Sequence, residues 1–304
     1  MQNGALNFSN ERAHAEFALR SLETGKATTL LNQLVRQRKL PRDGRGPLIE
    51  LVGTAGGEGE LAVLFSQLKS DGFDPAVHAR VLTALANAAR LRNTRPTGDL
   101  SGVGKFLNSD DRAIHTAAVH LVGAWKQVPQ VPALLMIAAG GDHAAFDSLV
   151  IIRGRKVVQG LKQLAGEDKS IATRQAAARA LGAINLKSSL AEIFAVLKAT
   201  EDANAALELW RGLLGVRGAG KLLAGGVAGA GLPKPIVTAG IRVAREGGRD
   251  EKALVAALAL SQNISLLTKQ MTAAELKTLA ARARCAAPVP PLHQSQRSKP
   301  ALPT

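Results

Sequence analysis

Residues 215–221 match the first part of a phosphate-binding loop, the motif G-x-x-x-x-G-K. In that motif a Ser or Thr follows the lysine and holds a magnesium ion, and a strand precedes the loop. Here Leu222 follows Lys221, and residues 205–214 have the apolar spacing of a helix. We therefore predict a loop that connects two helices, and we keep a nucleotide hydrolase that uses Lys221 as an alternative. The glycine-rich residues 225–231 predict a flexible turn.

Two clusters of basic residues are candidate sites for binding an anion or a partner. The first holds Arg36, Arg38, Lys39, Arg42 and Arg45, and the second holds Arg153, Arg155, Lys156 and Lys162. A nucleic-acid-binding protein would join both clusters in one continuous positive groove. Aromatic side chains for base stacking are scarce, and the net charge of +15 is spread along the sequence. A solvated surface is therefore the preferred interpretation of both clusters.

The histidines and the single cysteine offer no recognisable catalytic or metal chemistry. His115 and His120 are five residues apart, which does not place them on one face of a helix. His78 and His115 recur at one position of the repeat described below, so we expect them to be structural equivalents. Cys285 is the only cysteine, which excludes an intramolecular disulfide and a Cys-rich metal site. We expect neither an enzyme nor a cofactor.

Composition predicts a helical core built from small and aliphatic side chains. The 304 residues are 46% hydrophobic but only 3% aromatic, with no Tyr. Ala, Leu and Val must therefore fill the core, which favours closely packed helices. We expect Trp125 and Trp210 to pack in that core. The N-terminal residues have no secretory signal, and no segment has the ~18 uncharged apolar residues of a spanning helix, so we expect no membrane insertion.

A repeated segment organises most of the chain. Residues 173–184 read TRQAAARALGAI. Similar segments occur at residues 12–19, 77–86 and 114–125 and, in weaker form, from Ala145 and Ala205. Apolar residues recur in these copies at three- and four-residue steps, which indicates helices with one buried face.

Each copy begins with a candidate helix cap and is paired with a second helix. The candidate capping residues are Asp74, Asp110, Asp111, Ser170 and Asp202. The second helices are predicted at residues 61–68, 132–139, 157–164 and 190–197. A pair buries only part of its apolar surface alone, so the pairs must stack on one another. We expect the second helices to form a concave binding face.

The best copy resembles a HEAT repeat, whose helix reads roughly V-R-x-A-A-x-A-L-G. Residues 168–184 carry the matching side chains Arg174, Ala176, Ala177, Leu181 and Gly182. The valine position holds Thr173 instead, and the other copies place His78 and His115 at the arginine position. The resemblance implies an all-α, HEAT-like (armadillo-type) α-solenoid of five or six helical pairs. It also implies a non-catalytic scaffold or protein-interaction module, with nucleic-acid binding through basic ridges as the alternative.

Residues 87–126 are also similar to the HEAT region of large haem-binding proteins of planctomycetes and their relatives. In those proteins a β-propeller resembling sugar dehydrogenases precedes the HEAT region, and a cytochrome c domain follows it. The haem-attachment motif C-x-x-C-H is absent here, so no haem residue is carried over. The resemblance implies a fragment of a cell-envelope electron-transfer protein, with its flanking domains as partners. As a complete protein the chain would be expected in the cytoplasm, and as a fragment in the periplasm.

Three regions are predicted along the chain. Residues 1–211 hold the HEAT-like repeats, and residues 212–284 continue the array in a looser helical form. A capping-box pattern at residues 272–275 opens a last helix. Residues 285–304 contain five Pro and have no helical period, so they are predicted to form a disordered tail.

Overall fold

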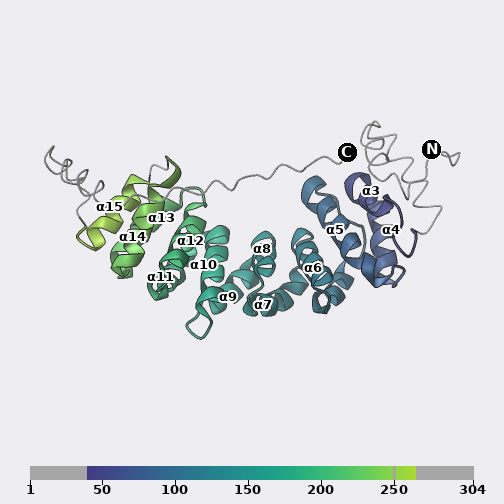
Figure 1. Ribbon diagram of the computed structural model, residues 1–304, viewed down its shortest axis with the longest axis horizontal. Coiled ribbons are helices and arrows are strands. Elements are labelled where there is room, and N and C mark those ends of the chain that lie inside the picture. The colour runs from purple at the N-terminus through teal and green to yellow at the C-terminus, as the bar shows by residue number, and fades with distance from the viewer. Residues whose placement is uncertain (1–39, 249–250, 265–304) are drawn as a thin grey trace, which may run out of the picture. The chain divides into compact units, whose positions relative to one another are not determined.

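The computed structural model describes residues 40–248 and 251–264, and within them every regular element is a helix (Figure 1). The α-helices are α3 (Leu48–Ala55), α4 (Glu58–Lys69), α5 (Pro75–Arg92), α6 (Arg112–Ala124), α7 (Val131–Ala139), α8 (His143–Ile152), α9 (Arg155–Leu164), α10 (Ile171–Asn185), α11 (Leu190–Ala199), α12 (Ala203–Leu214), α13 (Ala219–Ala230), α14 (Lys234–Ala244) and α15 (Lys252–Ser261). The short 3-10 helices are η1 (Ser101–Asn108), η2 (Val128–Gln130), η3 (Lys187–Ser189) and η4 (Glu246–Gly248). The all-α prediction is confirmed for these residues.

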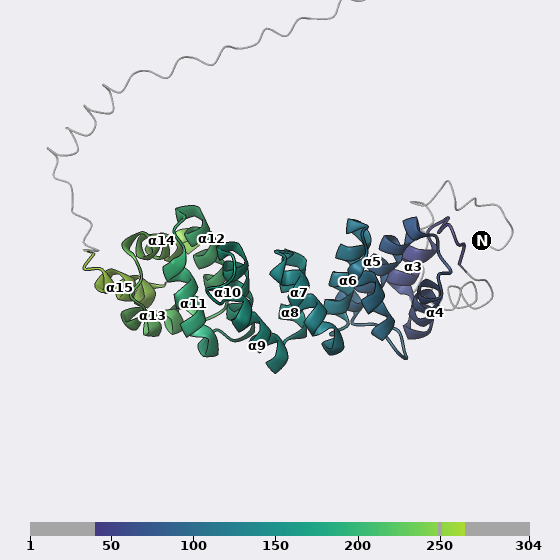
Figure 2. The ribbon, with the colours of Figure 1, turned by 90° about the horizontal axis from the view of Figure 1, so that it is seen from below.

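The helices form two sets that alternate along the chain. We call α3, α5, α6, α8, α10, α12 and α14 the first helices, and α4, η1, α7, α9, α11, α13 and α15 the second helices. Every first helix packs against the next first helix, and Figures 1 and 2 show these neighbours side by side. Among the second helices, α7 packs on α9, α11 on α13, and α13 on α15. Each helix therefore packs on the helices of neighbouring pairs rather than around one central core.

Small residues allow the first helices to approach one another closely. A Cβ on Gly123 of α6 would lie 2.7 Å from the Cβ of Ser148 in α8, and one on Gly53 of α3 would lie 2.9 Å from that of Ala84 in α5. Both predicted core tryptophans are fully buried, and Trp125 meets Phe65 edge-to-face at 4.9 Å between ring centroids. Because the core has few large aromatic side chains, neighbouring helices fill it by packing with their backbones close together.

The fourth residue of three first helices ties the helix to a carbonyl of the segment before it. A ring N–H of His78 donates to the carbonyl of Phe73 at 3.2 Å, and that of His115 donates to Leu107 at 2.6 Å. The guanidinium of Arg174 donates in the same way to the carbonyl of Ala165 at 3.3 Å. The predicted equivalence of His78 and His115 is confirmed, and Arg174 shares their role.

Four of the first helices have the caps expected from the sequence pattern. Asp111, Ser170 and Asp202 each accept a hydrogen bond from a backbone N–H in the first turn of their helix, and Asp142 does the same for α8. Asp74 is at the N-cap of α5, but its carboxylate makes no capping bond because it binds Arg42 instead. The capping role predicted for Asp74 is therefore wrong.

The structure differs from the sequence-based predictions in two further places. The predicted turn at residues 225–231 is wrong up to Ala230, because these residues continue helix α13 and only Gly231 has the left-handed backbone of a turn. A Cβ on Gly226 would collide with the ring of Phe194 in α11, so glycine is needed here for helix contact. Helix α3, which pairs with α4, and the helical form of η1 were not anticipated.

Several predictions concern residues outside the described part of the chain. These are the repeat copy at residues 12–19, the capping box at 272–275, Cys285 and the tail at 285–304. The boundary proposed between residues 211 and 212 lies inside α12, and helices α13 to α15 follow it. No helix in the described ranges is both long and apolar enough to span a membrane.

Candidate functional site

The glycine-rich residues 215–218 connect α12 to α13, which confirms the predicted loop between two helices. Lys221 is exposed in the first turn of α13. A Cβ on Gly220 would collide with the carboxylate of Glu251, so an acidic group lies where a phosphate-binding loop would need open space for an anion. This geometry does not match a phosphate-binding loop.

The first basic cluster is only partly within the described residues. Arg36, Arg38 and Lys39 lie outside them. Arg42 donates from Nε to Asp74 Oδ1 at 2.8 Å, and Arg45 pairs with Asp43 at 2.6 Å. Both described members of this cluster are therefore neutralised by local carboxylates.

The second basic cluster is divided by the structure. Arg153, Arg155 and Lys156 are exposed around the start of α9, and none of the three forms an ion pair with a described residue. Arg153 and Gly154 both have positive φ angles, 59° and 97°, which turn the chain sharply from α8 into α9. Lys162 lies further along α9 and pairs with Glu192 of α11 at 2.6 Å. The cations of this cluster that form no ion pair with a described residue thus lie in the α8–α9 turn and the first turn of α9.

Charge in the described residues separates according to the class of turn. The turns that lead from a second helix to the next first helix carry the acidic residues Asp71, Asp74, Asp110, Asp111, Asp142, Glu167, Asp168, Glu201 and Asp202, with Lys169 as their one basic residue. We call this set the acidic edge. The turns that lead from a first helix to its second helix, from α5 to α13, carry Arg95, Lys126, Arg153, Lys187 and Arg217, with Asp99 as their one acidic residue.

We call those five cations, together with Arg155, Lys156 and Lys221 in the first turns of α9 and α13, the basic edge; the first turn of α11 holds an acidic residue instead, Glu192, which pairs with Lys162. All eight side chains are exposed. The carboxylate of Asp99 accepts hydrogen bonds from the backbone N–H and the hydroxyl of Ser101, and these bonds lower its pKa. The separation differs from the even spread of charge inferred along the sequence.

Hydrogen bonds show that turns of one class are neighbours in space. On the basic edge, Arg95 of the α5–η1 turn donates to the carbonyl of Trp125 in the α6–α7 turn at 3.4 Å. On the acidic edge, His115 near the start of α6 lies 3.4 Å from Asp142 at the start of α8. A first helix separates the two edges along its whole length, which is ~15 Å or more at 1.5 Å per residue. That distance exceeds the Debye length of about 8 Å at physiological salt, so each edge keeps its own potential.

The basic edge ends before α15. Near this end, Arg211 of α12 forms a bidentate pair with Glu246 of η4, which lies between α14 and α15; both contacts are 2.9 Å, and Arg211 also binds Glu208. These carboxylates raise the pKa of Arg211. Arg92, near the other end of the edge, donates to the carbonyl of Gly53 at 3.0 Å, and burial lowers its pKa.

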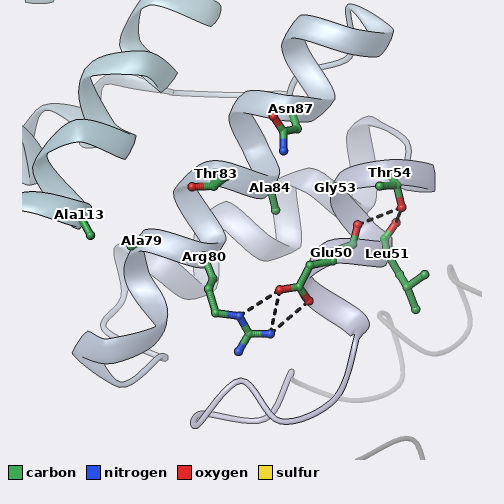
Figure 3. A pocket seen from close by; sticks show the side chains of 10 residues that line it. All are labelled: Glu50, Leu51, Gly53, Thr54, Ala79, Arg80, Thr83, Ala84, Asn87 and Ala113. Carbon is green, nitrogen blue, oxygen red and sulfur yellow. Dashed lines mark hydrogen bonds and ion pairs between the residues drawn. The ribbon is translucent and has the colours of Figure 1, made fainter. Parts of the chain in front are cut away.

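Three hollows lie between first helices. A cavity of about 550 Å³ opens beside α3, α5 and α6, and cavities of about 430 and 340 Å³ lie beside α12–α14 and α8–α10–α12. In the cavity beside α3, α5 and α6, Arg80 binds Glu50 through contacts of 2.9–3.1 Å, and Thr83 and Asn87 line the wall (Figure 3). The charges of this ion pair neutralise each other. In the described ranges, no group of three or more His, Cys, Asp or Glu side chains could hold a metal ion.

No family model, no curated protein and no solved structure matches this chain. Its function must therefore be argued from its own surface. Of the predicted site residues, the structure brings together Arg153, Arg155 and Lys156 and places Arg42 with the acidic Asp74. Sequence reasoning missed Arg95, Lys126, Lys187 and Arg217, which share only their class of turn with Arg153. Sorting the charges by turn class, once the helix pairs are assigned, is the signal that finds them.

Proposed function

We propose that this chain is a HEAT-like α-solenoid that acts as a non-catalytic scaffold for protein partners. The observation that carries this proposal is the uninterrupted packing of each first helix on the next, from α3 to α14. Such an array presents the same turns and helix faces once per pair, which gives an extended surface for a partner. Hydrogen bonds from His78, His115 and Arg174, each the fourth residue of its helix, to a carbonyl of the preceding segment support a common repeat.

Crosslinking in the source cells tests the scaffold. The tagged chain is treated with a lysine-reactive crosslinker, purified under denaturing conditions and analysed by mass spectrometry. We expect one or a few proteins in reproducible, near-stoichiometric yield, crosslinked to lysines on helices of this array. Recovery of nuclease-sensitive material without any crosslinked protein would contradict the proposal.

A nucleic-acid-binding protein is the second candidate, and the basic edge is the observation that favours it. Contacts of Lys and Arg with phosphates release counterions, so the affinity would fall steeply as salt rises. Filter binding of duplex DNA and RNA over a salt series separates the two candidates. Binding that ignores salt, or no binding, would remove this alternative.

The resemblance to large haem-binding proteins leads to a narrower proposal. In that setting the array would hold a dehydrogenase-like propeller and a cytochrome c domain at a fixed spacing in the cell envelope. Translation of the flanking DNA in all reading frames tests it directly. Absence of a C-x-x-C-H motif and of a propeller sequence in every frame would refute it.

A further inference from the structure

We propose that the basic edge docks an acidic polypeptide segment that also carries apolar side chains. This inference rests on the scaffold function proposed above and names the chemistry of the partner and the surface that receives it. Three features of the described residues carry it: the open cations, the apolar side chains among them, and their spacing along the array.

The cations of the basic edge are available to a partner. All eight are exposed, and within the described part of the chain none forms an ion pair with a carboxylate. Arg95 and Arg153 only donate to backbone carbonyls, at 3.4 and 3.3 Å. A row of unpaired cations of one sign raises the local concentration of an acidic partner and fixes its orientation.

Exposed apolar side chains are interleaved with these cations. Leu91 in the last turn of α5 lies four residues before Arg95, and Leu222 follows Lys221 directly. Val128 and Ile151 are each two residues from a cation, Lys126 and Arg153 respectively. The exposed fractions of the four are 76% for Leu91, 50% for Val128, 41% for Ile151 and 36% for Leu222.

These apolar side chains distinguish a polypeptide from a nucleic acid. Phosphate groups give no stabilising contact to Leu, Val or Ile, whereas apolar side chains of a peptide remove them from water. In the turns of this edge the one aromatic residue is Trp125, and it is fully buried, so these turns offer no aromatic ring for base stacking. The surface therefore fits an acidic polypeptide better than a nucleic acid.

The spacing of the turns sets the pattern expected in the partner. Packed helices lie about 8–10 Å apart, so successive turns of the basic edge recur at about that distance. A peptide in the polyproline II conformation has three residues per turn and rises ~3.1 Å per residue, so every third side chain faces the same side and meets a new turn. An acidic residue at every third position, with an apolar residue beside it, would match the edge.

Synthetic peptides test this surface by fluorescence anisotropy on the full chain. The probe is a labelled peptide of about 18 residues made of Glu-Leu-Ser repeats, which matches the estimated spacing. A peptide of Glu-Ser-Ser repeats has the same charge and spacing but no apolar side chains, and a duplex DNA of about 18 base pairs is the polyanion control. We expect the Glu-Leu-Ser peptide to bind about tenfold more tightly than either control.

Matched variants locate the binding. Reversal of three charges in R153E/R155E/K156E should weaken binding of the Glu-Leu-Ser peptide by about tenfold or more. The variant R112E/K198E/K234E makes the same change in net charge at exposed helix ends beside the acidic edge and should change the affinity by less than about threefold. V128S/I151S should reduce the preference for Glu-Leu-Ser over Glu-Ser-Ser, and L260S, whose side chain is exposed elsewhere, should not. Circular dichroism verifies that each variant keeps its helical content.

Three results would overturn the inference: no binding of any probe, duplex DNA binding as tightly as the Glu-Leu-Ser peptide, or equal losses in the two charge-reversal variants. The scaffold proposal fails separately. Crosslinks to a protein partner through other lysines, combined with no peptide binding at the basic edge, would retain the scaffold and reject this docking surface.

Discussion

The two edges of the helical array differ in what their charges do for the fold. On the acidic edge, Asp111, Asp142 and Asp202 each accept a backbone N–H of the following helix at 2.7–2.8 Å. On the basic edge, helices α9 and α13 begin after Gly154 and Gly218, and neither has a side-chain cap. Both helices then place cations in the first turn, where the positive end of the helix dipole disfavours them.

This difference separates a structural charge from a functional one. Carboxylates at helix N-termini stabilise the helices, so the acidic edge needs no partner to explain it. Arg155 and Lys156 at the N-terminus of α9 give no such stabilisation, and neither forms an ion pair with a described carboxylate. Lys126, Arg153 and Lys187 follow the C-termini of first helices, where the helix dipole favours cations. The first turn of α9 is therefore the part of the basic edge that helix stability does not explain.

Removal of the three aspartate caps should give the largest loss of stability. The variant D111A/D142A/D202A leaves four backbone donors in three helices without their side-chain acceptors, at about 1 kcal/mol for each helix. We expect the free energy of unfolding to fall by about 3 kcal/mol in urea titrations followed by circular dichroism.

Acidic residues in the same class of turn that make no capping bond provide the control. D110A/E167A/E201A removes the same charge from exposed positions and should cost less than about 1 kcal/mol in total. Equal losses in the two variants would show that net charge, rather than capping, explains the acidic edge.

Loss of the Arg174 side-chain hydrogen bond should have the next largest effect. Arg174 is 9% exposed and donates to the carbonyl of Ala165, so R174M leaves this carbonyl without that donor. We expect the free energy of unfolding to fall by about 1–2 kcal/mol. R179M, on the same helix but partly exposed, should change it by less than about 0.5 kcal/mol. Equal effects would contradict a structural role specific to the fourth helical position.

The helical pairs were predictable because their signals are local. A three- and four-residue apolar period, a capping residue before it and small residues within it identify α6, α8, α10 and α12 in advance. Helix α3 and the helical form of η1 were missed because each is only eight residues long and glycine-containing, so packing decides its form. Residues 225–230 were misread because Gly226 serves for contact with Phe194 rather than for a turn, and α13 continues through Gly225 and Gly229, around which there is open space.

The candidate surface was predictable only in part. Arg153, Arg155 and Lys156 lie close together in the sequence, so the sequence alone identifies them as a basic cluster. Lys126 and Lys187 are isolated charges in the sequence. They become candidate binding residues only because their turns lie on the basic edge. That assignment needs the pairing of helices, which a local charge pattern does not contain.

Asp74 should contribute less to stability than the aspartates that cap their helices. Its carboxylate binds the exposed Arg42 at 2.8 Å and makes no capping bond, so D74A should cost about 0.5 kcal/mol. D142A, a single capping change, should cost about 1 kcal/mol. A double-mutant cycle between Asp74 and Arg42 should give a coupling energy below about 1 kcal/mol. A D74A loss as large as that of D142A, without coupling to Arg42, would place Asp74 among the caps.

Removal of charge from the basic edge should have the smallest effect on stability, and its sign is the sharpest test of the comparison. R153Q/R155Q/K156Q removes two cations from the first turn of α9, where they oppose the helix dipole, and one from the C-cap of α8, where the dipole favours it. We expect the free energy of unfolding to stay unchanged or to rise by a few tenths of a kcal/mol at low salt. K162Q, which loses the ion pair with Glu192, should lower it slightly. A loss above about 1 kcal/mol in the triple variant would give these cations a structural role and remove the contrast between the edges, because charges that stabilise the fold need no partner to explain them.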